Sequence, residues 1–147
     1  METLMWTILL WIGANSSYNI PGTLPEIQYH TKLELRRMLF CENLEHCDDA
    51  RLPDVQVAAL FSPEKGIMFL RDTFQMENPK DESAIVHELT HFVQAFNGKF
   101  GNVCIGLLQK EAYGSADKWS VEHGHEAEPM TPMRMFEEMW CGTDSAT

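Results

Sequence analysis

Two histidines and a glutamate in the segment His87-Glu-Leu-Thr-His91 are the residues of this chain best suited to chemistry. His87 and His91 are four residues apart, so on a helix they project from one face and can bind one metal ion together. Glu88 lies on the same turn, where a carboxylate can take a proton from water. Neutral imidazoles bind zinc well, and a third ligand from a carboxylate leaves a fourth position open for water and substrate. The pattern predicts a zinc hydrolase.

The residues around this motif predict a helix that begins after Asn78 and ends at Asn97. Asn78 can cap the first turn, and Pro79 is tolerated there because its missing N–H would have no partner within the helix. Asn97 is followed by Gly98, which tolerates the left-handed conformation that ends many helices. Between these limits apolar side chains recur at helical spacing, at Ile85, Leu89, Phe92 and Phe96.

Glu111, twenty positions beyond His91, is the predicted third metal ligand. If residues 105–119 form a helix, Leu108 and Ala112 belong to one apolar stripe, and Glu111 lies at the edge of that stripe. A carboxylate on a buried face is costly unless it is paired or bound to metal. The alternative is an ordinary glutamate at the boundary of the core. Other carboxylates that could take its place follow in a polar stretch, at Glu122, Glu126 and Glu128.

The segments Ser83–Gln94 and Lys110–Tyr113 resemble the gluzincin (thermolysin-like) metallopeptidases, in which an HExxH helix is followed by a helix that donates a glutamate. The chain looks still closer to small gluzincin-like bacterial proteins that share a VHEL-x-H-x-x-Q helix, a Cys before the second helix and an EAY motif. The resemblance implies a zincin-like fold and a zinc-dependent peptidase. It also implies the roles of four residues: His87, His91 and Glu111 as zinc ligands and Glu88 as general base and acid.

One position departs from the pattern of the larger enzymes. There, an acidic residue four positions after the ligand glutamate orients one zinc histidine, whereas this chain has Ser115 at that place. The nearest carboxylate is Asp117. A donor that stabilises the oxyanion is also needed, and the candidates are His123, His125 and Tyr113. Tyr113 is two residues past Glu111 on a helix and so points away from that ligand.

Three short segments predict strands. Val55–Phe61 and Ile67–Arg71 are apolar runs joined by the turn residues Ser62–Gly66, and Glu26–His30 is the third candidate. We expect an α+β fold in which a small, mainly antiparallel sheet packs on the HExxH helix. By the same resemblance, the strand before that helix, Ile67–Leu70, runs along the cleft and pairs with extended substrate.

At 147 residues the chain is long enough for one core, so residues 1–147 are expected to form a single domain. The apolar run over residues 3–14 is too short to span a bilayer and lacks a basic start, which favours a core helix over a signal peptide, an anchor or a membrane-surface segment. No stable membrane insertion is expected. At the other end, residues Met130–Met139 predict a helix that packs through Met133, Phe136 and Trp140.

The four cysteines allow three pairings. Cys41 and Cys47 could close a small loop, and Cys104 and Cys141 could tie the second ligand-bearing helix to the C-terminal helix. Paired cysteines would indicate an exported protein, periplasmic or secreted, and reduced ones a cytoplasmic protein.

The net charge of −11 argues against nucleic acid as a partner, because phosphate binding requires a basic surface. The expected partner is a peptide or protein substrate. Zinc would be the cofactor, with Glu88 moving the proton from water to the leaving amine. Two alternatives remain: a zinc-binding domain without peptidase activity that binds a partner peptide, and a hydrolase of cell-wall amides.

Overall fold

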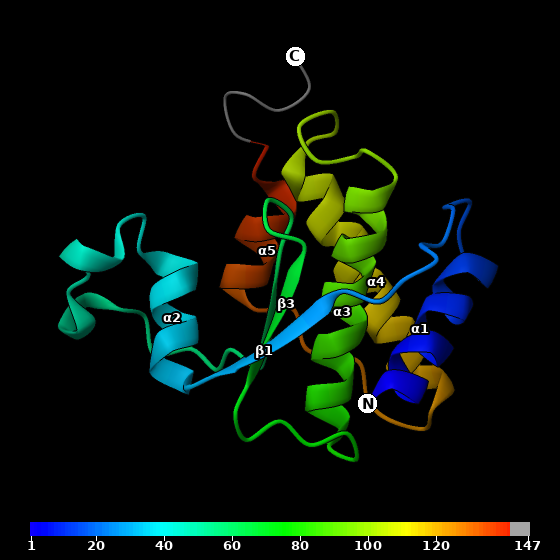
Figure 1. Ribbon diagram of the computed structural model, residues 1–147, viewed down its shortest axis with the longest axis horizontal. Coiled ribbons are helices and arrows are strands. Elements are labelled where there is room, and N and C mark those ends of the chain that lie inside the picture. The colour runs from blue at the N-terminus through cyan, green and yellow to red at the C-terminus, as the bar shows by residue number, and fades with distance from the viewer. Residues whose placement is uncertain (142–147) are drawn as a thin grey trace.

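Helix α3 (Pro79–Phe96), which carries both histidines of the motif, lies at the centre of the computed structural model, which describes residues 1–141 (Figure 1). The side chain of Asn78 accepts hydrogen bonds from two backbone N–H groups of the first turn. The helix ends at Asn97, and Gly98 follows with a φ of +69°, a conformation that favours glycine. Both predicted ends of the helix are confirmed.

The three predicted strands form one mixed sheet in the order β1–β3–β2. Strand β1 (Glu26–His30) pairs in parallel with β3 (Ile67–Arg71), and β2 (Ala59–Ser62) pairs antiparallel with β3. The expectation of a mainly antiparallel sheet is therefore wrong. A parallel pair needs a long crossover connection, and residues 31–66, which include a helix and β2, provide it.

The position of β3 also corrects the strand expected along the cleft. Because β1 and β2 occupy both edges of β3, Ile67–Leu70 lies in the middle of the sheet and has no free edge. The strand that faces α3 is β2, whose Phe61 N–H donates to Glu88 of α3 at 2.8 Å. The connection through residues 31–66 places β2 on one side of β3 and leaves β1 on the other. Pairing segments that are adjacent in the sequence as hairpins does not predict this strand order.

One main hydrophobic core lies between α1 (Glu2–Ala14), the sheet and α3. The expected core helix over residues 3–14 is confirmed, because Ile8 and Leu9 are fully buried. None of the helices within residues 1–141 is long and apolar enough to cross a membrane. Fully buried partners of α1 come from β3 and α3: Met68, Leu70, Ile85, Val86, Leu89 and Val93.

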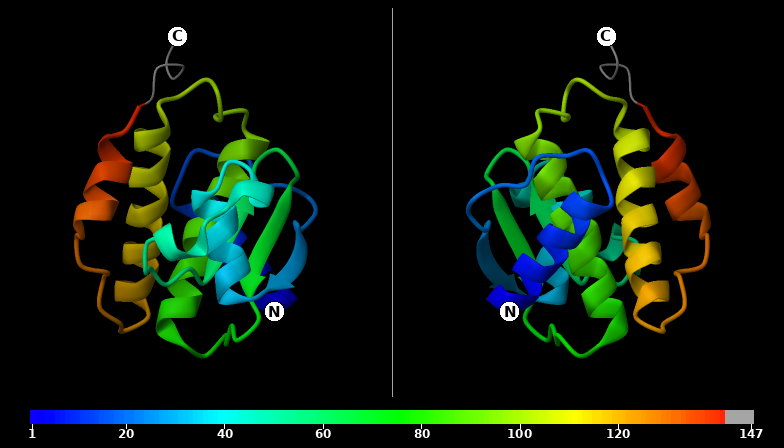
Figure 2. Two further views of the ribbon diagram at one scale, coloured as in Figure 1. Left: turned by 90° about the vertical axis from the view of Figure 1, so that its left-hand side faces the viewer. Right: turned by 90° about the vertical axis from the view of Figure 1, so that its right-hand side faces the viewer.

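Two helices stack outward from α3 on the side away from the sheet (Figure 2). Helix α4 (Ile105–Glu122) packs on α3, and α5 (Pro132–Met139) packs on α4. The predicted helix over 105–119 is confirmed and extends one turn further.

Helix α5 does not pack through the apolar side chains that the sequence indicated. Met133, Phe136 and Trp140 are exposed, and the buried residue is Arg134. Its guanidinium pairs with Asp117 at 2.7 Å and with Glu138 at 3.0 Å. A fully paired arginine can be buried, and apolar periodicity does not reveal such a pairing. The predicted contacts are therefore wrong.

Helix α2 (Lys32–Phe40) was not predicted from the sequence, although Thr31 and Glu34 form a capping box at its start. Two short 3-10 helices follow in the loop, Leu44–His46 and Asp49–Arg51. The four cysteines form two disulfides. Cys41–Cys47 closes the loop after α2, and Cys104–Cys141 ties the start of α4 to the end of α5.

Candidate metal centre

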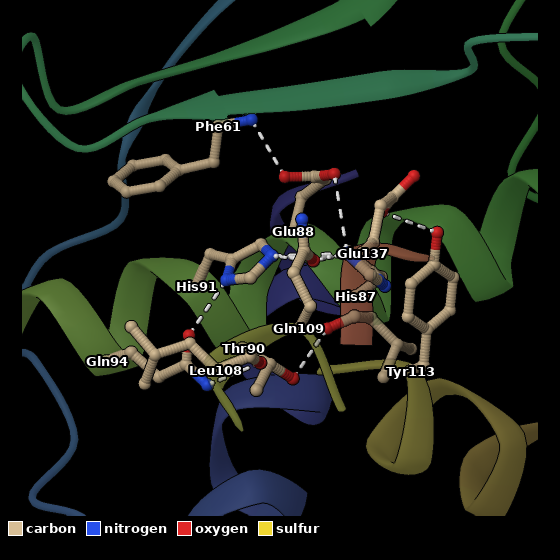
Figure 3. A network of polar contacts seen from close by, with 11 residues as sticks. Phe61, His87, Glu88, Thr90, His91, Gln94, Leu108, Gln109, Tyr113 and Glu137 are labelled. Carbon is tan, nitrogen blue, oxygen red and sulfur yellow. Dashed lines mark hydrogen bonds and ion pairs between the residues drawn. The ribbon is translucent and has the colours of Figure 1, made fainter. Parts of the chain in front are cut away.

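Helix α3 presents the partly buried His87 and the buried His91 on one face, as their spacing predicts (Figure 3). Their Nε2 atoms are 3.1 Å apart. Burial holds the pKa of His87 well below its usual value, and the neighbouring His91 imidazole lowers it further. Burial also lowers the pKa of His91. Both rings are therefore neutral at pH 7, which is the form that binds metal.

A third polar atom joins the two histidine nitrogens, and it comes from α4. The Oε1 atom of Gln109 lies 3.1 Å from His87 Nε2 and 2.9 Å from His91 Nε2. The three atoms thus form a nearly equilateral triangle. Zinc bound tetrahedrally at 2.0–2.2 Å would separate its ligand atoms by about 3.3 Å. The observed separations are shorter, so the two imidazole nitrogens and the amide oxygen would have to move apart by a few tenths of an ångström to hold one metal ion.

Glu111, the predicted third ligand, lies elsewhere on α4. Its side chain is exposed, and its Oε1 accepts a hydrogen bond from Gln94 Nε2 at 3.0 Å. Together with burial, the Glu111 carboxylate raises the pKa of the Tyr18 hydroxyl. Within residues 1–141, no three side chains of His, Cys, Asp or Glu gather closely enough to hold a metal ion. The structure thus brings His87 and His91 together without Glu111, whose role as a ligand stays a prediction.

The angular spacing of residues around α4 explains why Gln109, and not Glu111, faces the histidines. Successive residues of an α-helix are rotated by about 100°, so positions 109 and 111 lie about 200° apart around the axis. Leu108 and Ala112 are buried between them. Gln109 therefore flanks the buried stripe on the side of the histidines, and Glu111 flanks it on the other. The sequence places Glu111 at an edge of the buried stripe but does not show which of the two edges faces the histidines.

Gln94 takes the orienting role that the sequence analysis sought at Ser115 or Asp117. Its Oε1 lies 2.7 Å from His91 Nδ1, and its amide NH2 donates to the Leu108 carbonyl at 3.0 Å as well as to Glu111. Asp117 instead pairs with Arg134. Gln94 is three positions after His91 on the same helix, a spacing that could have identified it.

Glu88 lies beside the histidines and bridges α3 and β2. One carboxylate oxygen accepts the Phe61 N–H at 2.8 Å, and the other lies 4.0 Å from His87 Nε2. Burial raises the pKa of Glu88 to about 8, although the Phe61 N–H favours its charged form. Glu137 of α5 raises this pKa further through its negative charge. A carboxyl with a raised pKa next to two neutral imidazoles is suited to proton transfer.

His87, Glu88, Gln109 and Glu137 line a cleft of about 940 Å³ between β2, α3, α4 and α5. Tyr113 lines it too, with its ring centre 4.3 Å from that of His87 and its hydroxyl donating to Glu137 at 3.0 Å. It points away from Glu111, as expected, but towards the histidines. Glu137 carried no signal in the sequence, because only the packing of α5 on α4 brings it to the cleft.

The other candidates for oxyanion stabilisation lie away from the cleft. His123 stacks on Trp119, with ring centres 4.0 Å apart, and its Nδ1 is 2.7 Å from the Trp119 carbonyl oxygen. His125 is exposed in the loop after α4. Of the three candidates, Tyr113 alone lines the cleft that holds His87 and Glu88.

The chain matches one family model over residues 1–136, that of a domain of unknown function, DUF6647, and it belongs to this family. No curated protein and no solved structure matches it.

Proposed function

We propose that this member of the DUF6647 family is a zinc-dependent peptidase, with His87 and His91 as zinc ligands and Glu88 as general base and acid. The observation that carries the proposal is the placement of Glu88. One of its oxygens is held by the edge strand β2, and the other lies near the paired imidazoles on the wall of the cleft. Bound zinc would lower the pKa of water and polarise a carbonyl group.

The residues of the chain supply the rest of the chemistry. Glu88 accepts a proton from the attacking water and returns it to the leaving amine, and the positive charge of a bound zinc ion would favour the charged, proton-accepting form of this buried carboxyl. The Tyr113 hydroxyl is the candidate donor to the oxyanion, once it exchanges its bond to Glu137 for one to the substrate. Burial of His91 and of Glu88 limits the access of bulk water to their side chains.

An extended peptide is the substrate class that suits the cleft wall. Strand β2 pairs with β3 on one side only, and its other side faces α3 and the cleft. A strand edge can bind a peptide backbone by main-chain hydrogen bonds without reading its side chains. We therefore propose that β2, rather than β3, holds the substrate.

Glu88→Gln tests the proposed role of Glu88. The amide keeps the size of the side chain but cannot accept the proton, so we expect zinc content to be unchanged and turnover of a fluorogenic peptide library to fall by at least about 100-fold. Glu77→Gln, at an exposed position, is the matched control and should behave as wild type. An unchanged rate in Glu88→Gln would contradict the mechanism.

A second candidate is a zinc-binding domain that binds a partner peptide without cleaving it. The observation that favours it is that side chains cover the site. The Tyr113 hydroxyl is hydrogen-bonded to Glu137, and both residues lie beside His87 in the cleft. Zinc bound by the wild type without turnover of any peptide in the library would support this candidate over the peptidase.

We also propose that the protein is exported. Its two disulfides are of the kind that persists in oxidising compartments such as the periplasm or the extracellular space. Thiol labelling of protein taken directly from its native cells tests this, and four labelled cysteines would contradict it.

A further inference from the structure

We propose that Gln109 is the third metal donor of the site and that Glu111 acts at a distance, by holding Gln94 and through it His91. This inference rests on the metal centre of the proposed function and deepens it, because it assigns a ligand that differs from the one the HExxH…E pattern predicts. It gives the site a neutral set of three donors: two imidazoles and one carboxamide.

The first support is the position of the Gln109 amide oxygen. It is the atom of α4 that touches both histidine nitrogens, at 3.1 Å from His87 and 2.9 Å from His91. Amide carbonyl oxygens are established metal ligands in proteins. The Glu111 carboxylate instead meets Gln94, on the opposite edge of the buried stripe of α4.

The second support is the hydrogen-bond inventory around His91. The NH2 group of Gln94 faces two groups that can only accept, the Leu108 carbonyl and the Glu111 carboxylate. The orientation of the Gln94 amide is thereby fixed, with its oxygen facing His91 Nδ1 at 2.7 Å. Nδ1 must therefore donate, and a neutral His91 ring presents a lone pair at Nε2.

The Nε2 lone pair of His91 points at a lone pair of the Gln109 amide oxygen. His91 Nε2 and Gln109 Oε1 are both acceptors, yet they are 2.9 Å apart in a partly buried site. His87 Nε2 is 3.1 Å from each, and the single proton it can carry there satisfies only one of them. Three converging polar atoms that share at most one proton are an arrangement that a cation stabilises.

Glu111 has a positioning role in this arrangement. Its carboxylate and the Leu108 carbonyl together orient Gln94, which in turn fixes the tautomer and the ring plane of His91. Loss of such an outer partner lowers metal affinity by about 10- to 100-fold without removing a ligand. Loss of Gln109 removes a donor atom and should cost more.

A competing arrangement makes the opposite prediction. If the Gln109 amide is turned over, its NH2 group donates to both histidines and closes the site by hydrogen bonds alone. That site would bind no metal, and replacing Gln109 would release the histidines and increase affinity for Zn²⁺.

Metal titration of variants at Gln109, Glu111 and Gln94 separates these possibilities. Zn²⁺ affinity is measured by competition with a chromogenic chelator, and the donor set is monitored by the visible absorption of bound Co²⁺. We expect Gln109→Ala to weaken Zn²⁺ binding by at least about 100-fold and to change the Co²⁺ spectrum. Gln109→Glu, which adds a negative charge to the same position, should tighten binding by at least about tenfold. Exposed Gln75→Ala is the matched control, expected to be unchanged.

Glu111→Ala and Gln94→Ala test the role of Glu111. Glu111→Ala should weaken Zn²⁺ binding by about 10- to 100-fold and leave the Co²⁺ spectrum unchanged, because the donor atoms stay the same. Adding Gln94→Ala to it should cost no more than Gln94→Ala alone. Loss of binding in Glu111→Ala together with wild-type binding in Gln109→Ala would overturn the inference, as would tighter binding in Gln109→Ala. Thermal melting confirms that each variant is folded.

The outcomes also separate this inference from the proposed function. A wild type that binds Zn²⁺ through Gln109 but cleaves no peptide would refute the peptidase and leave the ligand assignment intact. A wild type that cleaves peptides and binds Zn²⁺ through Glu111 would support the peptidase and refute the ligand assignment. Absence of Zn²⁺ binding in both the wild type and Gln109→Glu would overturn the inference.

Discussion

The α3 half and the α4 half of the metal centre are built in different ways. Helix α3 supplies His87, Glu88 and His91 within five residues, so their relative positions follow from the geometry of a single helix. Helix α4 supplies Gln109 and Tyr113, whose positions relative to the histidines depend on how α4 is rotated against α3. A rotation of α4 about its axis would change which of its side chains faces the histidine pair without disturbing that pair. The proposed third donor is therefore the adjustable part of the candidate site.

The two halves also differ in what holds them in the fold. Helix α3 lies in the main core between α1, the sheet and α4, and many of its side chains are completely buried. Helix α4 has one buried stripe, and its outer side is held by α5 and by the Cys104–Cys141 disulfide. We therefore expect changes in α3 to act on global stability, and changes at the contact of α4 with α5 to act on the position of α4.

The largest effect is expected for Leu89→Ala in α3. Leu89 is fully buried, and its truncation should lower the free energy of unfolding by about 2–5 kcal/mol, because the transfer energy is lost and a cavity remains. Leu107→Ala is the control on α4, where the side chain is 58% exposed, and it should change stability by no more than about 0.5 kcal/mol. Denaturant unfolding measures both. A loss below about 1 kcal/mol in Leu89→Ala would mean that the core does not anchor α3.

This difference between the halves also explains how far the sequence could predict the site. The placement of His87, Glu88 and His91 on one helix and both ends of that helix were predicted correctly, because caps and spacing within one helix are local properties. That Gln109 rather than Glu111 faces the histidines was not predicted, because the two edges of the α4 stripe look alike until the rotation of the helix is known. Gln109 was not among the predicted ligands, because a glutamine is not a usual zinc ligand.

The fold shows the same division between local and distant information. All three strands were expected, and each is present, but the parallel pairing of β1 with β3 depends on a connection through residues 31–66. The packing of α5 was misjudged for a similar reason. Arg134 is buried by partners on α4 and α5 that no apolar pattern indicates. In both cases the deciding contact joins residues far apart in the chain.

A smaller effect is expected where α4 meets α5, at Gly106. A Cβ atom there would lie 2.6 Å from the Glu138 carbonyl oxygen and 2.7 Å from that of Trp140, so Gly106→Ala must displace the backbone of α5. We expect a loss of about 1–3 kcal/mol in the free energy of unfolding. Because Glu137 of α5 lies over the cleft, Gly106→Ala should also alter the fluorescence of a fluorogenic peptide bound in the cleft.

Gly114→Ala is the matched control for Gly106→Ala. Gly114 lies in the same helix, and nothing is within 4 Å of a Cβ added to it. Alanine should therefore stabilise the protein by about 0.4–1 kcal/mol, because it favours the helix and restricts the unfolded chain. Equal effects of the two substitutions on stability would show that α5 does not press on α4. The contact with α5 would then not help to position α4.

The smallest effect is expected at the start of α3, far from the histidines along the helix. Asn78→Ala removes the side-chain oxygen that accepts two backbone N–H groups and should cost about 1 kcal/mol. Asn78→Asp keeps the cap and should stay within a few tenths of a kcal/mol of wild type. Zn²⁺ affinity should be unchanged in both, since the geometry of the pair depends on the turn between His87 and His91. A fall in affinity in Asn78→Ala that Asn78→Asp restores would show that the α3 half is adjustable too, and that the contrast between the halves is one of degree.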